Sequence, residues 1–199
     1  MPQEVDSTIS ALPSISYPWY EVWWRALIPR VETYQDLLLD PDFSRKRAYI
    51  WLFISLLIST LISMIGETVF ETGNGEVEIW LFLCGPITIT ILALAAIIIS
   101  TAITQWIARL LGGTGTYTDL IYAVASYLSP LLLIASLINL LPYGECLSLF
   151  LGLYRYAQEI TVIKAVNRFS WAKAFTTMII PGFILIALII GLFVLTRLI

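Results

Sequence analysis

A polar face interrupts a hydrophobic stretch in the last third of the sequence. Its members follow the spacing i, i+4, i+7 and i+11, which places them on one side of a helix: Ser148, Gly152, Arg155 and Glu159. Gln158 adjoins this face. Each charge at mid-bilayer would cost roughly 2.5–3.5 kcal/mol. We therefore expect Arg155 and Glu159 to pair with each other across one helical turn.

Two interpretations of this polar face remain open. The first is a polar site or a solute path inside a helix bundle, formed by Arg155, Gln158 and Glu159. The second is a structural ion pair that fixes the helix against its neighbours, or that reaches a water-filled vestibule on the cytoplasmic side. The two interpretations differ in what they predict for transport, because a structural pair has no solute to move.

Most catalytic and metal-binding chemistry lacks the residues that it needs. The chain has no histidine, which excludes histidine-based triads, axial haem histidines and imidazole zinc sites. Its two cysteines, Cys84 and Cys146, have no partners for metal ligation or nucleophilic catalysis. Both fall toward the predicted outer face, where an oxidising exterior would allow a disulfide between them. We expect a non-enzymatic protein with no metal, cofactor or nucleic-acid partner.

A glycine-rich segment, "LGGTGTYTD", is superficially similar to a phosphate-binding loop. It follows no predicted strand and lacks the Gly-Lys-Ser/Thr sequence that such loops use. A tight turn between two helices is the better interpretation, with Thr118 or Asp119 capping the second helix.

Composition assigns the chain to the membrane class. Of its 199 residues, 59% are hydrophobic and only 13% are charged, whereas soluble domains carry about 25% charged residues. We predict an all-α integral membrane protein, a bundle of five transmembrane helices. Each apolar run approaches or exceeds the ~20 residues that a bilayer requires, and the runs lie at about 49–65, 79–107, 120–141, 147–166 and 175–195.

Basic residues alternate along the chain and predict its orientation. Five of them precede the first predicted span, namely Arg25, Arg30, Arg45, Lys46 and Arg47. The next loop, at 66–78, has no lysine or arginine, and the following basic loops contain Arg109 and then Arg168 and Lys173. By the positive-inside rule, the N-terminus is cytoplasmic and the C-terminus lies on the opposite side.

The residues before the first span divide into two parts. Residues 1–17 are polar and serine-rich, which predicts a disordered tail. Residues 18–46 form an amphipathic segment interrupted by Pro29, and residues 47–199 form the membrane domain. The apolar stripe of the amphipathic segment either lies among lipid headgroups or packs on the cytoplasmic ends of the spans.

Aromatic and small residues suggest how the helices contact lipid and one another. Tryptophans concentrate where the interfaces are expected, as aromatic anchors do: Trp19, Trp23, Trp24, Trp51, Trp80 and Trp106. The second span carries a ridge of small residues that would allow close helix approach, within the bundle or in a homo-oligomer: Ala93, Ala96, Ser100 and Thr104.

Three stretches resemble the Yip family, membrane proteins named as interactors of Ypt/Rab small GTPases, including its prokaryotic members. They are "ALIPRVETYQDLLLDPD", "LGGTGTYTDLIYAVASYLSP" and "LYRYAQEITVIKAVNRFSWAKAFTTMIIP". The resemblance implies five spans, a cytoplasmic N-terminus and a role as a partner or scaffold without catalytic residues. The "DLYGP"-type cytoplasmic motif of eukaryotic members is missing, with "DLLLDP" in its place, so small-GTPase binding is not expected.

Two functional hypotheses follow. The leading one is a scaffold or accessory subunit that works through contacts with other membrane proteins, or with itself, in the lipid bilayer. The alternative is a small transporter or channel with its path around Arg155 and Glu159.

Overall fold

The computed structural model describes residues 16–70 and 79–183. Every regular element in these two ranges is a helix, which confirms the all-α prediction. In chain order the labelled helices are α1 Trp19–Ala26, α2 Val31–Leu37, α3 Arg45–Phe70, α4 Ile79–Leu110, α5 Tyr117–Asn139 and α6 Gly144–Asn167. A further helix begins at residue 171 and reaches the end of the described range at 183.

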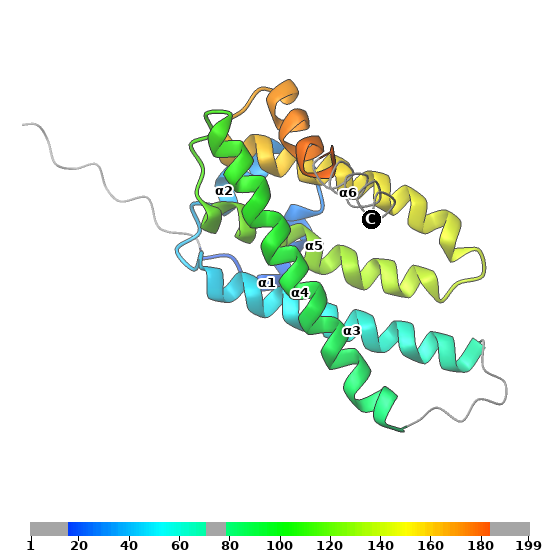
Figure 1. Cartoon of the computed structure of the whole chain (residues 1–199). Coiled ribbons are helices and arrows are strands. Elements are labelled where there is room, and N and C mark those ends of the chain that lie inside the picture. The colour runs from blue at the N-terminus through cyan, green and yellow to red at the C-terminus, as the bar shows by residue number, and fades with distance from the viewer. Residues whose placement is uncertain (1–15, 71–78, 184–199) are drawn as a thin grey trace, which may run out of the picture.

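The core of the molecule lies where α5 packs against α3 and α6 (Figure 1). Residues 120–131 of α5 are all buried, so this helix is enclosed on every side rather than along one stripe. Tyr122 and Tyr127 are among the largest fully or almost fully buried side chains. The other long helices therefore use α5 as their common packing partner.

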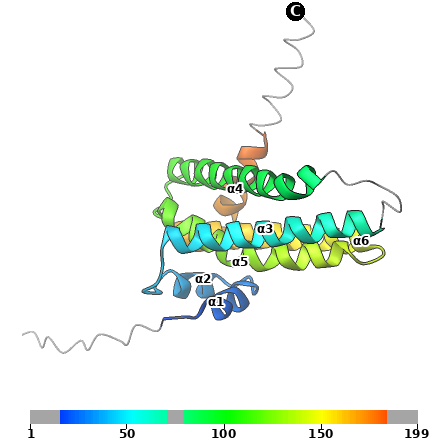
Figure 2. The ribbon, with the colours of Figure 1, turned by 90° about the horizontal axis from the view of Figure 1, so that it is seen from below.

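Helix α4 and the α1–α2 pair lie on opposite faces of this core (Figure 2). Helix α4 packs mainly on α3 and less on α5, while α1 packs on α5 and α2 on α6. Of the three helices that are long and apolar enough to span a membrane, α4 has the smallest buried share. Helix α4 is thus a peripheral element attached to one side of the bundle.

Three helices in the described part of the chain satisfy the length and hydropathy of a membrane span: Arg45–Gly66, Cys84–Leu110 and Tyr117–Asn139. These correspond to the first three predicted spans. Helix α6 has 24 residues, long enough for a bilayer, but it contains Arg155, Glu159 and Lys164. The predicted fifth span, at 175–195, starts within the helix of residues 171–183, and its remainder lies outside the described residues.

Within the segment of residues 18–46, two short helices, α1 and α2, lie on either side of Pro29, which cannot continue a helix that precedes it. Val22 and Ala26 of α1 and Tyr34 and Leu37 of α2 are buried. The pair therefore packs along the flank of α5 and α6 rather than only on the helix ends (Figure 2).

The glycine-rich segment is a tight turn between α4 and α5, as predicted. The residue that caps the start of α5 is Thr116, however, and not Thr118 or Asp119. The Thr116 hydroxyl accepts from the Asp119 backbone N–H at 3.2 Å, and the Asp119 carboxylate accepts from the Thr116 N–H at 2.8 Å. This reciprocal arrangement is a capping box. The prediction was wrong by a few residues because Asp119 takes part from the N3 position and not from the cap.

Candidate functional site

The polar face of α6 lines two adjoining cavities between α6 and its neighbours. One, of about 150 Å³, lies between α5 and α6 and includes Ser148, Gly152 and Arg155. The other, of about 30 Å³, is bounded by α4, α5 and α6 and includes Arg155 and Glu159. Even the smaller of the two cavities is large enough to hold a water molecule. The structure therefore places all four residues of the predicted face at these two cavities, and Arg155 lines both of them.

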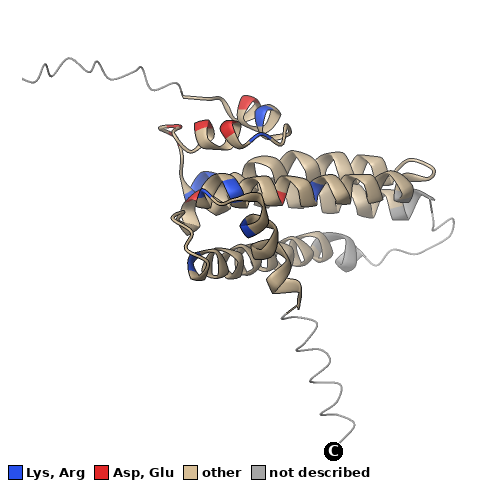
Figure 3. Ribbon diagram, turned by 90° about the horizontal axis from the view of Figure 1, so that it is seen from above, with Lys and Arg blue, Asp and Glu red and all other residues tan. Residues whose placement is uncertain are grey.

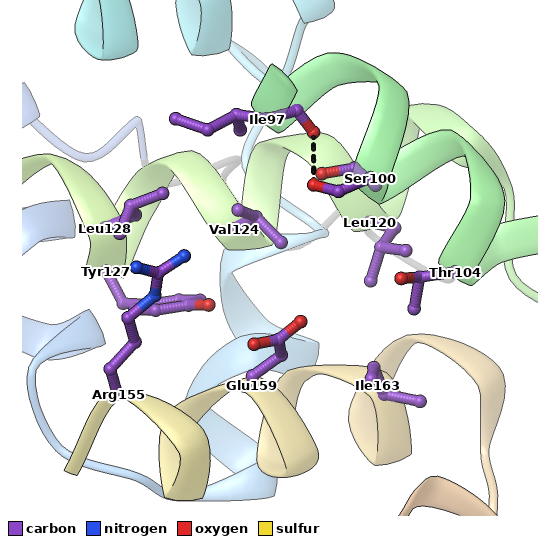
Figure 4. A pocket seen from close by; sticks show the side chains of 11 residues that line it. Ile97, Ser100, Thr104, Leu120, Val124, Tyr127, Leu128, Arg155, Glu159 and Ile163 are labelled. Carbon is purple, nitrogen blue, oxygen red and sulfur yellow. Dashed lines mark hydrogen bonds between the residues drawn. The ribbon is translucent and has the colours of Figure 1, made fainter. Parts of the chain in front are cut away.

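Arg155 and Glu159 both project from α6 toward the space beneath α4 (Figure 4). Ser100 and Thr104 of α4 form the opposite wall, and Tyr127 of α5 lies between. The ion pairs in the described part of the chain, defined by N–O distances of at most 4.0 Å, do not include one between these two residues. The expected direct pair is thus not formed, because both side chains extend into the cavity and not along the helix surface.

Gln158 faces the other side of α6 and is fully buried under the α1–α2 pair. Its amide nitrogen donates to the Leu27 carbonyl at 2.9 Å and to the Tyr154 hydroxyl at 2.6 Å. The Tyr34 hydroxyl lies 2.7 Å from the Gln158 amide oxygen and 2.8 Å from the Ala26 carbonyl. Gln158 consequently does not belong to the site that the sequence grouped it with. It holds the N-terminal helices.

Burial also affects the acidity of the Tyr34 hydroxyl in this contact. It raises the pKa of the Tyr34 hydroxyl well above its ordinary value, with smaller contributions from Tyr127 and Tyr154. The hydroxyl is therefore even harder to ionise than an exposed tyrosine, and its single proton is shared between the Ala26 carbonyl of α1 and the Gln158 amide oxygen of α6.

Sequence reasoning missed a second polar network, at the end of the bundle where α4 and α6 terminate. The Gln105 amide nitrogen donates to the Gly115 carbonyl at 2.7 Å and to the Asn167 amide oxygen at 3.1 Å. Gln105 and Asn167 are both buried. The sequence does contain a signal for this network, since an amide side chain lies just inside the end of each helix, next to a glycine-rich turn. A buried amide requires a hydrogen-bond partner, so these two amides were candidates to bind each other or the turn.

A third network anchors the segment before α3. Asp40 is buried, and its carboxylate accepts from Arg47 at 3.2 Å. Arg47 also donates to the Tyr17 carbonyl at 2.8 Å and lies over the Trp51 ring at 4.8 Å. Arg47 is thus part of the core attachment of the N-terminal segment, and not only a topology signal.

The predicted tryptophan anchors divide into two groups. Trp19, Trp24 and Trp106 are exposed, as residues that meet lipid would be. Trp23 and Trp51 instead pack edge to face between α1 and α3, with ring centroids 6.1 Å apart, and Trp51 is buried. The side chain of Trp80 lies outside the described residues. The sequence did not separate the two groups, because a tryptophan at a helix end suits either role.

The predicted small-residue ridge of α4 is only partly an internal packing face. Thr104 is buried, Ala93 is half-buried, and Ala96 and Ser100 are exposed. The middle of the ridge is therefore more exposed than its two ends.

Cys84 and Cys146 are both exposed free thiols, so the disulfide that the sequence allowed is not formed. Among the described residues, no group of three His, Cys, Asp or Glu side chains could hold a metal ion.

The family assignment follows from the extent of a single match. A family model, the Yip1 domain, matches residues 26–193. The chain belongs to the Yip1 domain family. The match confirms the resemblance seen in the sequence and supports an integral membrane protein in contact with the lipid bilayer. Comparison with curated proteins and with solved structures gave no match.

The start of the Yip1 domain coincides with the last residue of α1. It begins at Ala26, whose carbonyl accepts from Tyr34. It then includes α2, all the long helices, both cavities and the three polar networks. Most of α1 precedes it, although α1 packs on α5 within the domain. The candidate site is therefore internal to the Yip1 domain.

Proposed function

We propose that this Yip1 domain protein acts without catalysis, as a scaffold or accessory subunit that associates laterally with other membrane proteins or with a second copy of itself. The observation that carries the proposal is the placement of α4. This helix leaves the small residue Ala96 exposed, and Ser100, which also lines the cavity beneath α4, is exposed as well. Small residues allow another helix to approach closely in a membrane, where packing and not the hydrophobic effect drives association.

The arrangement in the membrane that we propose has five spans, with α6 as the fourth and the helix that starts at residue 171 leading into the fifth. The N-terminus is cytoplasmic. Two observations support this arrangement. Helix α6 packs along α5, and lysine and arginine gather at the end of the bundle where α3 begins (Figure 3). The exposed Trp19 and Trp24 of α1 would then lie among cytoplasmic headgroups.

A matched pair of substitutions tests the proposed association. Ala95 and Ala96 are adjacent and both exposed on α4, but they point about 100° apart. The tagged protein is purified in mild detergent, and stoichiometric co-eluting membrane proteins are identified by mass spectrometry. We expect Ala96→Trp to lose the partner that wild type and Ala95→Trp retain. A wild-type protein that elutes as a monomer with no partner would overturn the proposal.

The cavities favour one alternative, a small transporter or channel. Arg155 and Glu159 lack a direct ion pair, and Arg155 lines both of the neighbouring cavities between Ser148 and Glu159. Unpaired charges within a bundle mark solute or ion pathways. Arg155→Leu with Glu159→Leu separates the possibilities in planar bilayers. Loss of a wild-type conductance by a correctly folded double mutant supports transport, and an unchanged conductance removes the passage from the path.

A further inference from the structure

The three consecutive basic residues at the start of α3 have different environments. Arg47 is neutralised by Asp40 at 3.2 Å and lies 3.9 Å from Asp42. Arg45 and Lys46 form no ion pair within the described part of the chain. Two positive charges therefore remain uncompensated at the point where the first span enters the membrane.

Arg45 and Lys46 stand at the mouth of a groove between α3 and α4. The groove has a volume of about 680 Å³, and its other walls are apolar or aromatic: Tyr49, Ile50, Phe53, Ile54 and Leu94. No acidic residue lines it. Asp42 lines the neighbouring groove with Arg47 and Trp51, and the two grooves share Ile50 and Ile54. The charge of this site is therefore purely positive.

The dimensions of the groove match one leaflet of a bilayer. From Arg45 to Ile54 the helix advances about 13.5 Å, at 1.5 Å per residue. Half of the ~30 Å hydrocarbon core is about 15 Å. A lipid whose headgroup lies beside Arg45 and Lys46 would thus place most of an acyl chain along the apolar wall.

The structure also orients Arg45 for this role. Its Nε donates to the Thr118 hydroxyl at 2.6 Å, and its guanidinium lies 5.4 Å from the Tyr117 ring centre. The Tyr49 and Tyr117 hydroxyls are 3.2 Å apart. Asp119, the acid at the start of α5, is engaged with Thr116 in the capping box. Among the described residues, the terminal guanidinium nitrogens of Arg45 have no hydrogen-bond acceptor.

We propose that the α3–α4 groove binds an anionic phospholipid, with its phosphate against Arg45 and Lys46 and one acyl chain along Phe53, Ile54 and Leu94. Basic pockets between transmembrane helices hold anionic headgroups in this way. A zwitterionic lipid of the same chain length has the same apolar contacts but no net charge, so the site selects by headgroup.

The test is native mass spectrometry of the full-length protein, delipidated and titrated with phosphatidylglycerol or phosphatidylcholine of identical acyl chains. We expect wild type to retain phosphatidylglycerol preferentially. Each basic residue near a lipid surface contributes roughly a 5-fold change in affinity, so Arg45→Gln with Lys46→Gln should reduce phosphatidylglycerol binding by about 30-fold. Raised salt should weaken the preference as well.

The control variant also removes two positive charges, but from positions outside the groove. Arg30→Gln with Arg109→Gln replaces two exposed basic residues that do not line the groove. This variant should retain the preference. Leu94→Trp, which fills the groove and keeps both charges, should weaken binding of both lipids. Equal retention of both lipids by wild type would overturn the proposal, as would equal losses in the two charge variants. No effect of Leu94→Trp would show surface adsorption instead and reject the groove.

Discussion

Gln158 and Tyr34 form a contact between residues that are 124 positions apart. The amide and the hydroxyl are both buried, and together they satisfy two backbone carbonyls of the α1–α2 junction, those of Ala26 and Leu27. In a buried site, an unmatched polar group costs about 1–3 kcal/mol. The attachment of the N-terminal helices therefore depends on a few hydrogen bonds as well as on apolar contact.

Tyr34→Phe and Gln158→Leu should each lower the free energy of unfolding by about 1–3 kcal/mol. The double mutant should lose less than the sum, because the two side chains share one interaction. Denaturant titration in detergent micelles, followed by tryptophan fluorescence, measures all three. Tyr20→Phe is the control, since Tyr20 is exposed, and a comparable loss there would contradict the assignment.

Gly115 and Gly152 differ in the space around them. A Cβ at Gly115 would lie 2.5 Å from Val166 Cγ1 and 2.7 Å from the Val166 carbonyl oxygen, whereas a Cβ at Gly152 meets nothing within 4 Å. Gly115→Ala should therefore destabilise the protein by about 1–3 kcal/mol through overpacking. Gly152→Ala should be neutral or stabilising by up to about 1 kcal/mol, because it removes backbone freedom from a helix.

The melting temperatures of the two glycine variants are compared by thermal unfolding in the same detergent. If the melting temperature fell equally in both, the close approach of the glycine turn to the end of α6 would not be the determining feature.

At the scale of elements, the segment between α2 and α3 connects the N-terminal pair to the bundle through Asp40 and Arg47. The Asp40 side chain is fully inaccessible, and that of Arg47 is 18% exposed. Removal of one partner would leave a buried charge, which costs about 3–5 kcal/mol. The exposed neighbour Lys46 makes no such pair.

Arg47→Gln should thus destabilise the docking of α1 and α2 by about 3 kcal/mol, while Lys46→Gln changes it by less than about 0.5 kcal/mol. Limited proteolysis of the purified protein detects the difference as faster cleavage between Pro18 and Ser44 in Arg47→Gln. Equal cleavage rates in the two variants would show that the ion pair does not hold the segment.

The elements that the sequence predicted well are those whose apolar residues form long continuous runs, because length and hydropathy alone define them. The packing partners of α1 and α2 could not be predicted, since they depend on side chains more than 100 positions away, such as Gln158. Within the site, the sequence analysis grouped Gln158 with Glu159 because the two residues are adjacent in sequence, and this grouping was wrong. One residue turns the helix by about 100°, which sends Gln158 to a different face from Glu159.

At the scale of the whole molecule, the direction in which α5 crosses the bilayer can be measured with the chain's own thiols. Cys146 is exposed near the start of α6, and Thr114 is exposed in the turn at the other end of α5. In intact cells, a membrane-impermeant maleimide should label Cys146 in a Cys84→Ser background.

In a cysteine-free background, Thr114→Cys should react with that reagent only after permeabilisation, because the proposed orientation places the basic end of the bundle in the cytoplasm. Labelling of both positions from one side would show that α5 does not cross the membrane, and the reverse pattern would invert the proposed orientation.

The placement of α1 and α2 has a consequence for biogenesis. These helices leave the ribosome first, yet they pack on α5 and α6, which are synthesised much later. Tyr34 must wait for Gln158 before its hydroxyl has its partner on α6. A docked N-terminal pair can therefore form only after α5 and α6 have been synthesised, so the docking of α1 and α2 reports that the chain has been completed through α6.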